Sequence, residues 1–224
     1  RWTQRAYLQS VSQFARHFGR SPEQISREEL REYMLYLIHE RKVAWSTYNI
    51  ARCSLRFLYE ETLGQSGVLQ GLPCPKGPKR LPVVLTFGEV AKFFEACPSP
   101  RYLTLFQCAY AGGLRVSEAA NLRVCDIDSQ RMVIHIQQGK GGRDRYVPLS
   151  PRLLETLRDY WRRYKPTEWL FPGEPDSLPI TTGSVMRYCH PIRVLADLGK
   201  RVTMHSLRHS YATPLVEAGT DLRS

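Results

Sequence analysis

Residues 71–82 constrain the fold of this chain more than any other stretch of its sequence. They contain four prolines, two glycines and three basic residues. Proline removes a backbone donor and fixes φ, so this stretch disfavours a helix and favours an extended segment. We therefore predict a basic linker at residues 73–85, between a domain at residues 1–72 and a second domain at residues 86–224. A plain surface loop is the alternative.

The first predicted domain has the apolar periodicity of a small helical bundle. The apolar face of its first helix would consist of Tyr7, Val11, Phe14, Ala15 and Phe18. Ser26 precedes two glutamates and an apolar run, which is typical of a capped helix start. Ser46 or Thr47 can cap a third helix. The residues expected on the buried side of that helix are Ile50, Leu55, Leu58 and Tyr59.

The second predicted domain mixes helices with strands. Residues 131–137 alternate apolar and polar side chains, and residues 145–149 return after a glycine-rich turn. This pattern predicts a β-hairpin with Lys140 at its tip. Helices are predicted after Thr86, over 103–111, 153–164 and 185–198 with an interruption at Pro191, and from Met204 or His205 onward. We expect a mainly α chain with a small antiparallel β-hairpin or sheet, the second domain being of the α+β type.

The composition indicates a polyanionic partner. The 224 residues carry a formal net charge of +11 and have a pI of about 9.6, and such an excess favours nucleic acid. No stretch approaches the roughly 18 unbroken apolar residues of a membrane span. The six cysteines form no Cys-x-x-Cys pair. We therefore expect neither disulfides nor structural zinc, and a reducing, cytoplasmic setting.

Arg115 follows two glycines at the predicted start of a helix. Helix starts present free N–H groups, and a guanidinium there can hold two oxygens of one phosphate. The alternative is a surface arginine paired with Glu118. Lys140 at the hairpin tip is either solvated, or it enters a DNA groove and gives a proton to a leaving alkoxide.

His205 and Arg208 are three residues apart and would share one face of a helix, with His209 nearby. Two arginines can neutralise the extra negative charge of a pentavalent phosphorane, while a histidine and a lysine move protons. Such a set needs no metal ion. The sequence also lacks a P-loop and any obvious cluster of paired acids for Mg²⁺.

Three blocks of the sequence resemble, in residues and order, the landmark blocks of the tyrosine recombinase (phage integrase) family. They are GLRVSEA at 113–119, GKGGRDRYVPL at 139–149 and HSLRHSYAT at 205–213. The likeness covers nearly the whole chain and is closer to Xer-type and transposon-borne integrases than to integron integrases. It implies a DNA-binding core-binding domain before the linker and a catalytic domain after it.

The resemblance also implies a role for each matching residue. Arg115 and Arg208 would bind the scissile phosphate, and Lys140 would protonate the leaving 5′ oxygen. His205 would act as general acid and base. The supporting residues would be Glu118 and His209.

In this family a tyrosine attacks the phosphate and forms a 3′-phosphotyrosyl link, without metal ion, ATP or other cofactor. The resemblance implies double-stranded DNA as partner, four protomers on the DNA, a monomer or weak oligomer without it, and a place on a mobile genetic element. The residues expected to contact DNA are Lys76, Lys79, Arg80, Arg143 and Arg145.

Two parts of the family pattern would follow the last residue of this chain, namely a Leu-Gly-His type segment and the nucleophilic tyrosine. Tyr188 and Tyr211 stand at the wrong places for a nucleophile. We therefore expect a C-terminally incomplete catalytic domain that is inactive as given. Pro214 would fall inside the last helix, where it either misplaces Arg208 or is tolerated as a kink.

Three functions stay open on these observations. The first is an active recombinase whose C-terminal segment is absent from this chain. The second is a catalytically inactive relative that occupies recombination sites. The third is a type IB topoisomerase, which uses a similar residue set, although the small N-terminal bundle favours the recombinase.

Overall fold

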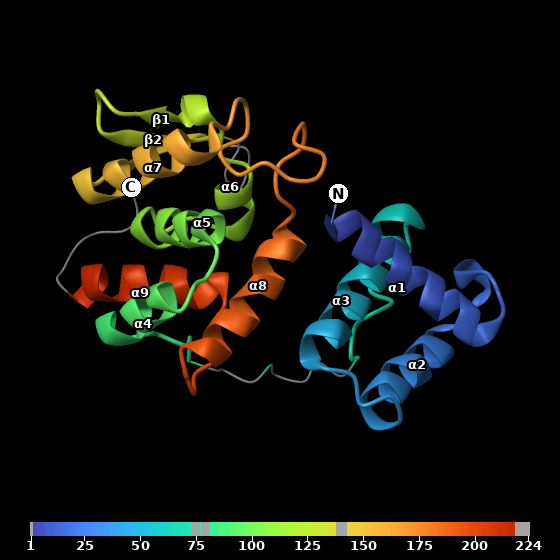
Figure 1. Cartoon of the computed structure of the whole chain (residues 1–224). Helices are drawn as coiled ribbons and strands as arrows, with labels where there is room; N and C mark the ends of the chain where they lie inside the picture. Colours follow the sequence, from blue (N-terminus) through green and yellow to red (C-terminus); the bar gives the residue numbers. More distant parts are fainter. Residues whose placement is uncertain (1, 73–76, 78–80, 138–142, 218–224) are drawn as a thin grey trace. The chain divides into compact units, whose positions relative to one another are not determined.

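The computed structural model contains two compact units, Arg1–Arg80 and Leu81–Ser224, each with its own hydrophobic core. The described residues are 2–72, 77, 81–137 and 143–217, with the backbone alone for 2 and 215–217. Helices dominate both units, and a small antiparallel sheet lies in the second (Figure 1). The predicted fold class is therefore confirmed. None of the helices in these ranges combines the length and the apolar content needed to cross a membrane.

The first unit is a bundle of helices around one buried ring. Phe14 is fully buried, and its ring centroid lies 5.0 Å from that of Tyr33 and 6.5 Å from that of Tyr59. These three rings bring together α1, α2 and the turn after α3, so they fix the bundle. The elements are α1 (Trp2–Phe18), the 3₁₀ turn η1 (Pro22–Gln24), α2 (Arg27–His39), α3 (Trp45–Arg56) and the π-helical turn η2 (Phe57–Thr62).

Capping boxes begin two helices where the sequence predicted helix starts. Ser26 Oγ accepts the N–H of Glu29 at 3.2 Å, and the Glu29 carboxylate accepts the N–H of Ser26 at 2.9 Å. Thr86 and Glu89 form the same reciprocal pair at the start of α4 (Phe87–Glu95). Each pair satisfies two N–H groups that a helix start leaves unbonded.

The predicted start of the third helix is wrong. Helix α3 begins at Trp45 after Ala44, whose side chain makes no cap hydrogen bond, rather than after Ser46 or Thr47. Ile50, expected to be buried, is 40% exposed. It directly precedes the buried Ala51, and consecutive residues on a helix point about 100° apart, so its side chain lies to one side of the buried face. The buried residues of this helix are Tyr48, Ala51, Ser54 and Leu55.

Helix α5 is the centre of the second unit. It packs against α4, α6, α7 and α9 (Figure 1), and Leu105, Phe106 and Cys108 on it are fully buried. The remaining elements are α5 (Pro100–Ala111), α6 (Val116–Ala120), the 3₁₀ turn η3 (Val124–Asp126), β1 (Ile127–Asp128), β2 (Val133–Ile136), β3 (Arg145–Pro148), α7 (Pro151–Tyr164), α8 (Thr182–Leu195) and α9 (Met204–Glu217).

The predicted hairpin is confirmed as β2 and β3. The strands are antiparallel, with Ile134 opposite Val147 and Ile136 opposite Arg145. Strand β1 pairs with the other side of β2. It was not predicted, because two residues are too few to show alternation. The predicted tip with Lys140 lies outside the described residues.

Two helices of the second unit contain an internal proline. Helix α8 is continuous across Pro191, so the predicted interruption is wrong. Proline removes one hydrogen bond, but buried residues on both sides of it hold this helix. They are Val185, Cys189 and Ile192. Pro214 lies inside α9, as predicted, and α9 continues to Glu217.

We predict that Phe93→Ala lowers the free energy of unfolding of the second unit by about 3–5 kcal/mol, because truncating a buried ring leaves a cavity. Phe93 is fully buried on α4, with its ring centroid 5.3 Å from that of Phe106. Phe87→Ala on the same helix is the matched control, since Phe87 is 73% exposed, and it should change stability by less than about 0.5 kcal/mol. Guanidinium chloride unfolding followed by circular dichroism measures both. Equal losses would contradict the packing of α4.

Candidate functional site

A buried carboxylate lies at the centre of the candidate site. The side chain of Glu118 on α6 is only 5% exposed. Its Oε1 accepts Nη1 of Arg115 at 2.7 Å and Nη1 of Arg145 at 2.8 Å. Its Oε2 accepts the backbone N–H of Arg115 at 2.8 Å and Nη2 of Arg145 at 2.8 Å. A carboxylate has about four acceptor directions, so these four bonds saturate it.

These bonds keep Glu118 ionised. Burial alone would raise the pKa of this carboxyl, but the hydrogen bonds from Arg145 and Arg115 outweigh burial and lower the pKa of Glu118 to about 2. The site therefore contains a permanent anion at neutral pH, and the arginines around it are held by that charge.

Arg115 is placed by the turn between α5 and α6. Gly113 in this turn has a φ of +55°, and a Cβ there would come within 2.9 Å of the Tyr211 ring, so glycine is required on both counts. Arg115 follows as the N-cap of α6, with its side chain 35% exposed. Within the described residues, Glu118 is the only hydrogen-bond partner of its guanidinium. A guanidinium carries five N–H donors, so Arg115 keeps donors for a bound anion.

Arg208 reaches the same turn from α9. Its Nη1 donates a hydrogen bond to the carbonyl oxygen of Gly113. Burial and then the positive charge of Arg115 lower the pKa of Arg208. The two guanidiniums thus repel each other, and an anion bound by both would relieve that repulsion.

Hydrogen bonds on its buried side hold α9 in place. Ser210 Oγ accepts the N–H of Leu85 at 2.7 Å and donates to the carbonyl oxygen of Ser206 at 2.7 Å. Leu85 directly precedes the cap of α4. The helix that carries Arg208 is therefore fixed to the segment at which the second unit begins.

The structure brings Arg115, Glu118 and Arg208 together, as three of the predicted site residues. Arg115 pairs with Glu118, as the alternative interpretation expected, and binding of a phosphate by its remaining donors stays a prediction. Arg145, expected to contact DNA, binds Glu118 with both of its η nitrogens, and its contact with DNA stays a prediction. Sequence reasoning missed this pair because its members are 27 residues apart on different elements, and no local spacing rule connects them.

The other predicted site residues lie around this group or outside the described part of the chain. His205 and His209 are exposed on α9, with their ring centroids 6.1 Å apart. Arg143 is exposed before β3. The predicted site residues outside the described ranges are Lys76, Lys79, Arg80 and Lys140.

The charges of this group favour an anion with several oxygens. Among the residues that the structure describes, three guanidiniums face one carboxylate here, which leaves two positive charges uncompensated. Arg208 on α9 hydrogen-bonds the carbonyl oxygen of Gly113, two residues before Arg115 at the start of α6, so arginines from different elements meet at one backbone turn. Forked guanidiniums arranged in this way suit a phosphate.

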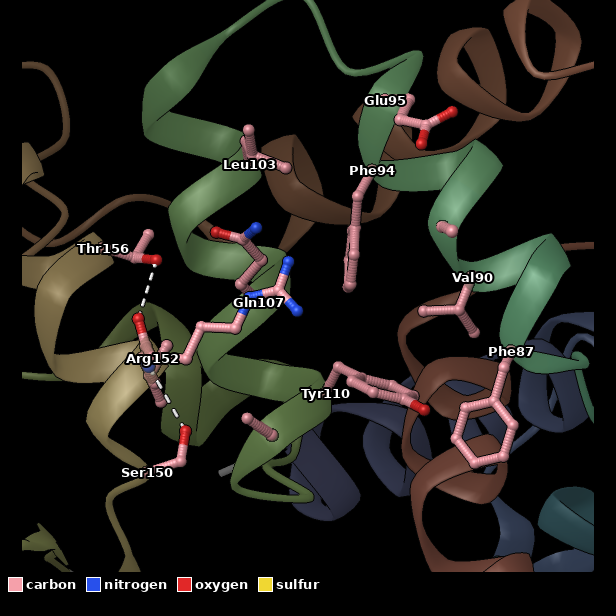
Figure 2. Close-up of a pocket in the computed structure, with 13 residues that line it drawn as sticks. Phe87, Val90, Phe94, Glu95, Leu103, Gln107, Tyr110, Ser150, Arg152 and Thr156 are labelled. Atoms are coloured by element: carbon pink, nitrogen blue, oxygen red, sulfur yellow. Dashed lines mark hydrogen bonds between the residues drawn. The ribbon is translucent and has the colours of Figure 1, made fainter.

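A hollow of about 490 Å³ lies elsewhere in the second unit, between α4, α5 and the start of α7. Figure 2 shows Val90 and Phe94 of α4 on one side of it and Leu103 and Gln107 of α5 on the other. Its lining is mostly apolar and includes none of the predicted site residues. The chemistry suited to phosphate therefore lies in the arginine group and not in this hollow.

We predict that the stability difference between the wild type and Glu118→Gln depends on pH. Because the pKa of Glu118 is about 2 in the folded chain, below its ordinary value, its stabilising effect is complete above about pH 5 and is lost as the pH falls towards 2. Urea unfolding between about pH 7 and pH 3 measures the difference, which should shrink on acidification. Glu155→Gln, at an exposed position on α7, is the matched control. A difference that stays constant would contradict the arginine-held carboxylate.

Comparison with known proteins assigns the chain to a family. Residues 83–224 match the phage integrase family, and residues 1–66 match the phage integrase N-terminal SAM-like domain. The putative integrase/recombinase y4qK of Sinorhizobium fredii is 48% identical over 223 residues, which are 99% of this chain and 72% of that protein.

Two solved structures share the fold. The crystal structure of XerA recombinase matches with a TM-score of 0.58 and 26% identity, over 100% of this chain and 80% of that one. A lambda integrase tetramer bound to a Holliday junction matches with a TM-score of 0.74 and 20% identity, over 96% of this chain and 64% of that one. With both parts of the sequence matched, this chain belongs to the phage integrase family of tyrosine recombinases.

Proposed function

We propose that this chain is the DNA-binding and phosphate-activating part of a site-specific recombinase that acts through a 3′-phosphotyrosyl intermediate, without metal ion or ATP. The observation that carries the proposal is the convergence of Arg115 and Arg208 on the turn at Gly113, beside the saturated carboxylate of Glu118. Family membership supports the same reaction.

In this proposal Arg115 and Arg208 bind two non-bridging oxygens of the scissile phosphate. A tyrosine oxygen attacks the phosphorus, and the pentavalent phosphorane that forms carries one more negative charge than the phosphodiester. The bond from phosphorus to the 5′ oxygen then breaks. Donors and charges already in place when that charge develops lower the barrier without reorganising. The two uncompensated positive charges of the site suit this demand.

Proton transfer falls to His205 and Lys140. An imidazole can take and return a proton near neutral pH, and His205 is exposed on α9, three residues before Arg208. Lys140 would give its proton to the leaving 5′ oxygen. His209 supports His205 from the next turn, where the two rings stack with their centroids 6.1 Å apart.

Duplex DNA is the proposed partner. Residues 1–72 would form the core-binding domain and residues 86–224 the catalytic domain, joined by a basic linker at 73–85. The proposed direct phosphate contacts outside the catalytic group are Lys76, Lys79, Arg80 and Arg143. A tetramer on DNA is proposed by analogy with the lambda integrase tetramer, and a cytoplasmic setting follows from the substrate.

The nucleophile is not assigned to a tyrosine of residues 1–224. Tyr211 packs against Gly113 and lies edge-on to Tyr110, with ring centroids 6.2 Å apart. Tyr188 stacks on Tyr102 at 3.8 Å. Both rings have packing roles, so we propose that the attacking tyrosine belongs to a segment after α9.

The test uses a chimera in which the C-terminal segment of a catalytically competent family member, with its tyrosine, follows residue 224. We predict that it forms covalent adducts with members of a nicked duplex library of randomised sequence, captured under denaturing conditions and sequenced. Arg208→Ala should lower the yield at least about 100-fold, because one lost donor to the developing charge has that effect. Arg162→Ala is the matched control, since Arg162 is 69% exposed in a surface pair with Asp159.

Other outcomes of this experiment separate the remaining functions. Residues 1–224 alone should bind the selected duplexes, more weakly as salt rises, and form no adduct; an adduct would mean that the nucleophile lies within them. Binding without adducts from a folded chimera would favour an inactive relative. Plasmid relaxation without sequence selection would favour a topoisomerase.

A further inference from the structure

We propose that Arg145 is a positioning residue of the phosphate site. By occupying both oxygens of Glu118, it keeps Arg115 from closing a two-bond pair with that carboxylate, and so leaves the Arg115 guanidinium free for phosphate. This inference rests on the proposed function and extends it to a residue that the family resemblance suggested only as a DNA contact.

Arg115 and Arg145 bind Glu118 in different ways. Arg145 forms a two-bond pair with Glu118, through Nη1 and Nη2 at 2.8 Å each. The Arg115 guanidinium has one bond to the same carboxylate, at 2.7 Å. The two guanidiniums thus share Glu118 unequally, because the second bond from Arg115 comes from its backbone N–H, and the Arg115 guanidinium keeps free donors.

Without Arg145, Glu118 would lose two of its four hydrogen bonds. The carboxylate is 5% exposed, and a buried carboxylate that loses two hydrogen bonds must replace them. The nearest source is Arg115, whose guanidinium can turn to present a second N–H to the carboxylate. Each donor that Arg115 gives to Glu118 is one fewer for a phosphate.

Arg145 and Glu118 lie on different elements of the second unit. Arg145 begins β3 and lies opposite Ile136 in the hairpin ladder, whereas Glu118 lies on α6. The two-bond pair therefore ties the sheet to the helix that Arg115 caps. Ile136 is buried, so the strand end that holds Arg145 is itself anchored in the core.

The Arg145→Lys variant separates the effect of hydrogen-bond geometry at position 145 from the effect of positive charge there. An ammonium keeps the positive charge but cannot form two parallel hydrogen bonds to a carboxylate. If Arg145 supplied only charge, Arg145→Lys would have little effect. If it positions Arg115 through Glu118, Arg145→Lys should weaken phosphate binding, but only while Glu118 is present.

The experiment follows arginine Nε–H signals of residues 1–224 by NMR during titration with inorganic phosphate at constant ionic strength. The wild type should show saturable shifts at Arg115 and Arg208, and none at the exposed Arg162. Arg145→Lys should raise the phosphate Kd about fivefold, since residues of one network couple strongly. In the Glu118→Gln background the same change should alter the Kd less than about twofold, because the path through the carboxylate is gone.

Each other outcome has a distinct meaning. Wild-type affinity in Arg145→Lys would overturn the positioning role. An equal loss in both backgrounds would also overturn it, and would mean that Arg145 touches the phosphate directly. Absence of saturable shifts in the wild type would contradict the phosphate site itself, and the positioning role with it. Dispersed amide spectra of all variants establish that they are folded.

Discussion

The bonds between Glu118 and its arginines are the interaction on which the rest of the site depends. One buried carboxylate receives four hydrogen bonds from Arg115 and Arg145, which connects the turn after α5 to the hairpin. Arg208 joins them from α9 through the carbonyl of Gly113. A buried anion therefore holds two arginines close to a third, where their own repulsion would otherwise separate them.

Much of the fold could be predicted because it depends on local rules. Examples are the capping pairs of Ser26 and Thr86, the alternation of β2 and the apolar face of α5. In each of them, the residues involved are only a few positions apart in sequence. Such patterns follow from the geometry of one helix or one strand. The errors in local structure have similar causes. Helix α3 begins after Ala44 without a side-chain cap, and α8 continues through Pro191 because buried residues on both sides of it hold the helix.

The site was only partly predictable. Arg115, Glu118 and Arg208 followed from residue chemistry and family resemblance. The bond from Arg145 to Glu118 depends on the tertiary fold, which brings together positions 27 residues apart. This bond places Arg145 on the same carboxylate as Arg115 and is the basis of the positioning role that we propose for it. The requirement for glycine at position 113 likewise appears only when the Tyr211 ring is seen against it.

The most direct test of the central claim is to find where a phosphate-like oxyanion binds. Crystals of residues 1–224 soaked in tungstate would locate it by anomalous scattering. We expect the strongest peak to lie within hydrogen-bonding distance of both Arg115 and Arg208, beside the turn at Gly113. Tungstate bound elsewhere, with no peak between these two arginines, would contradict it.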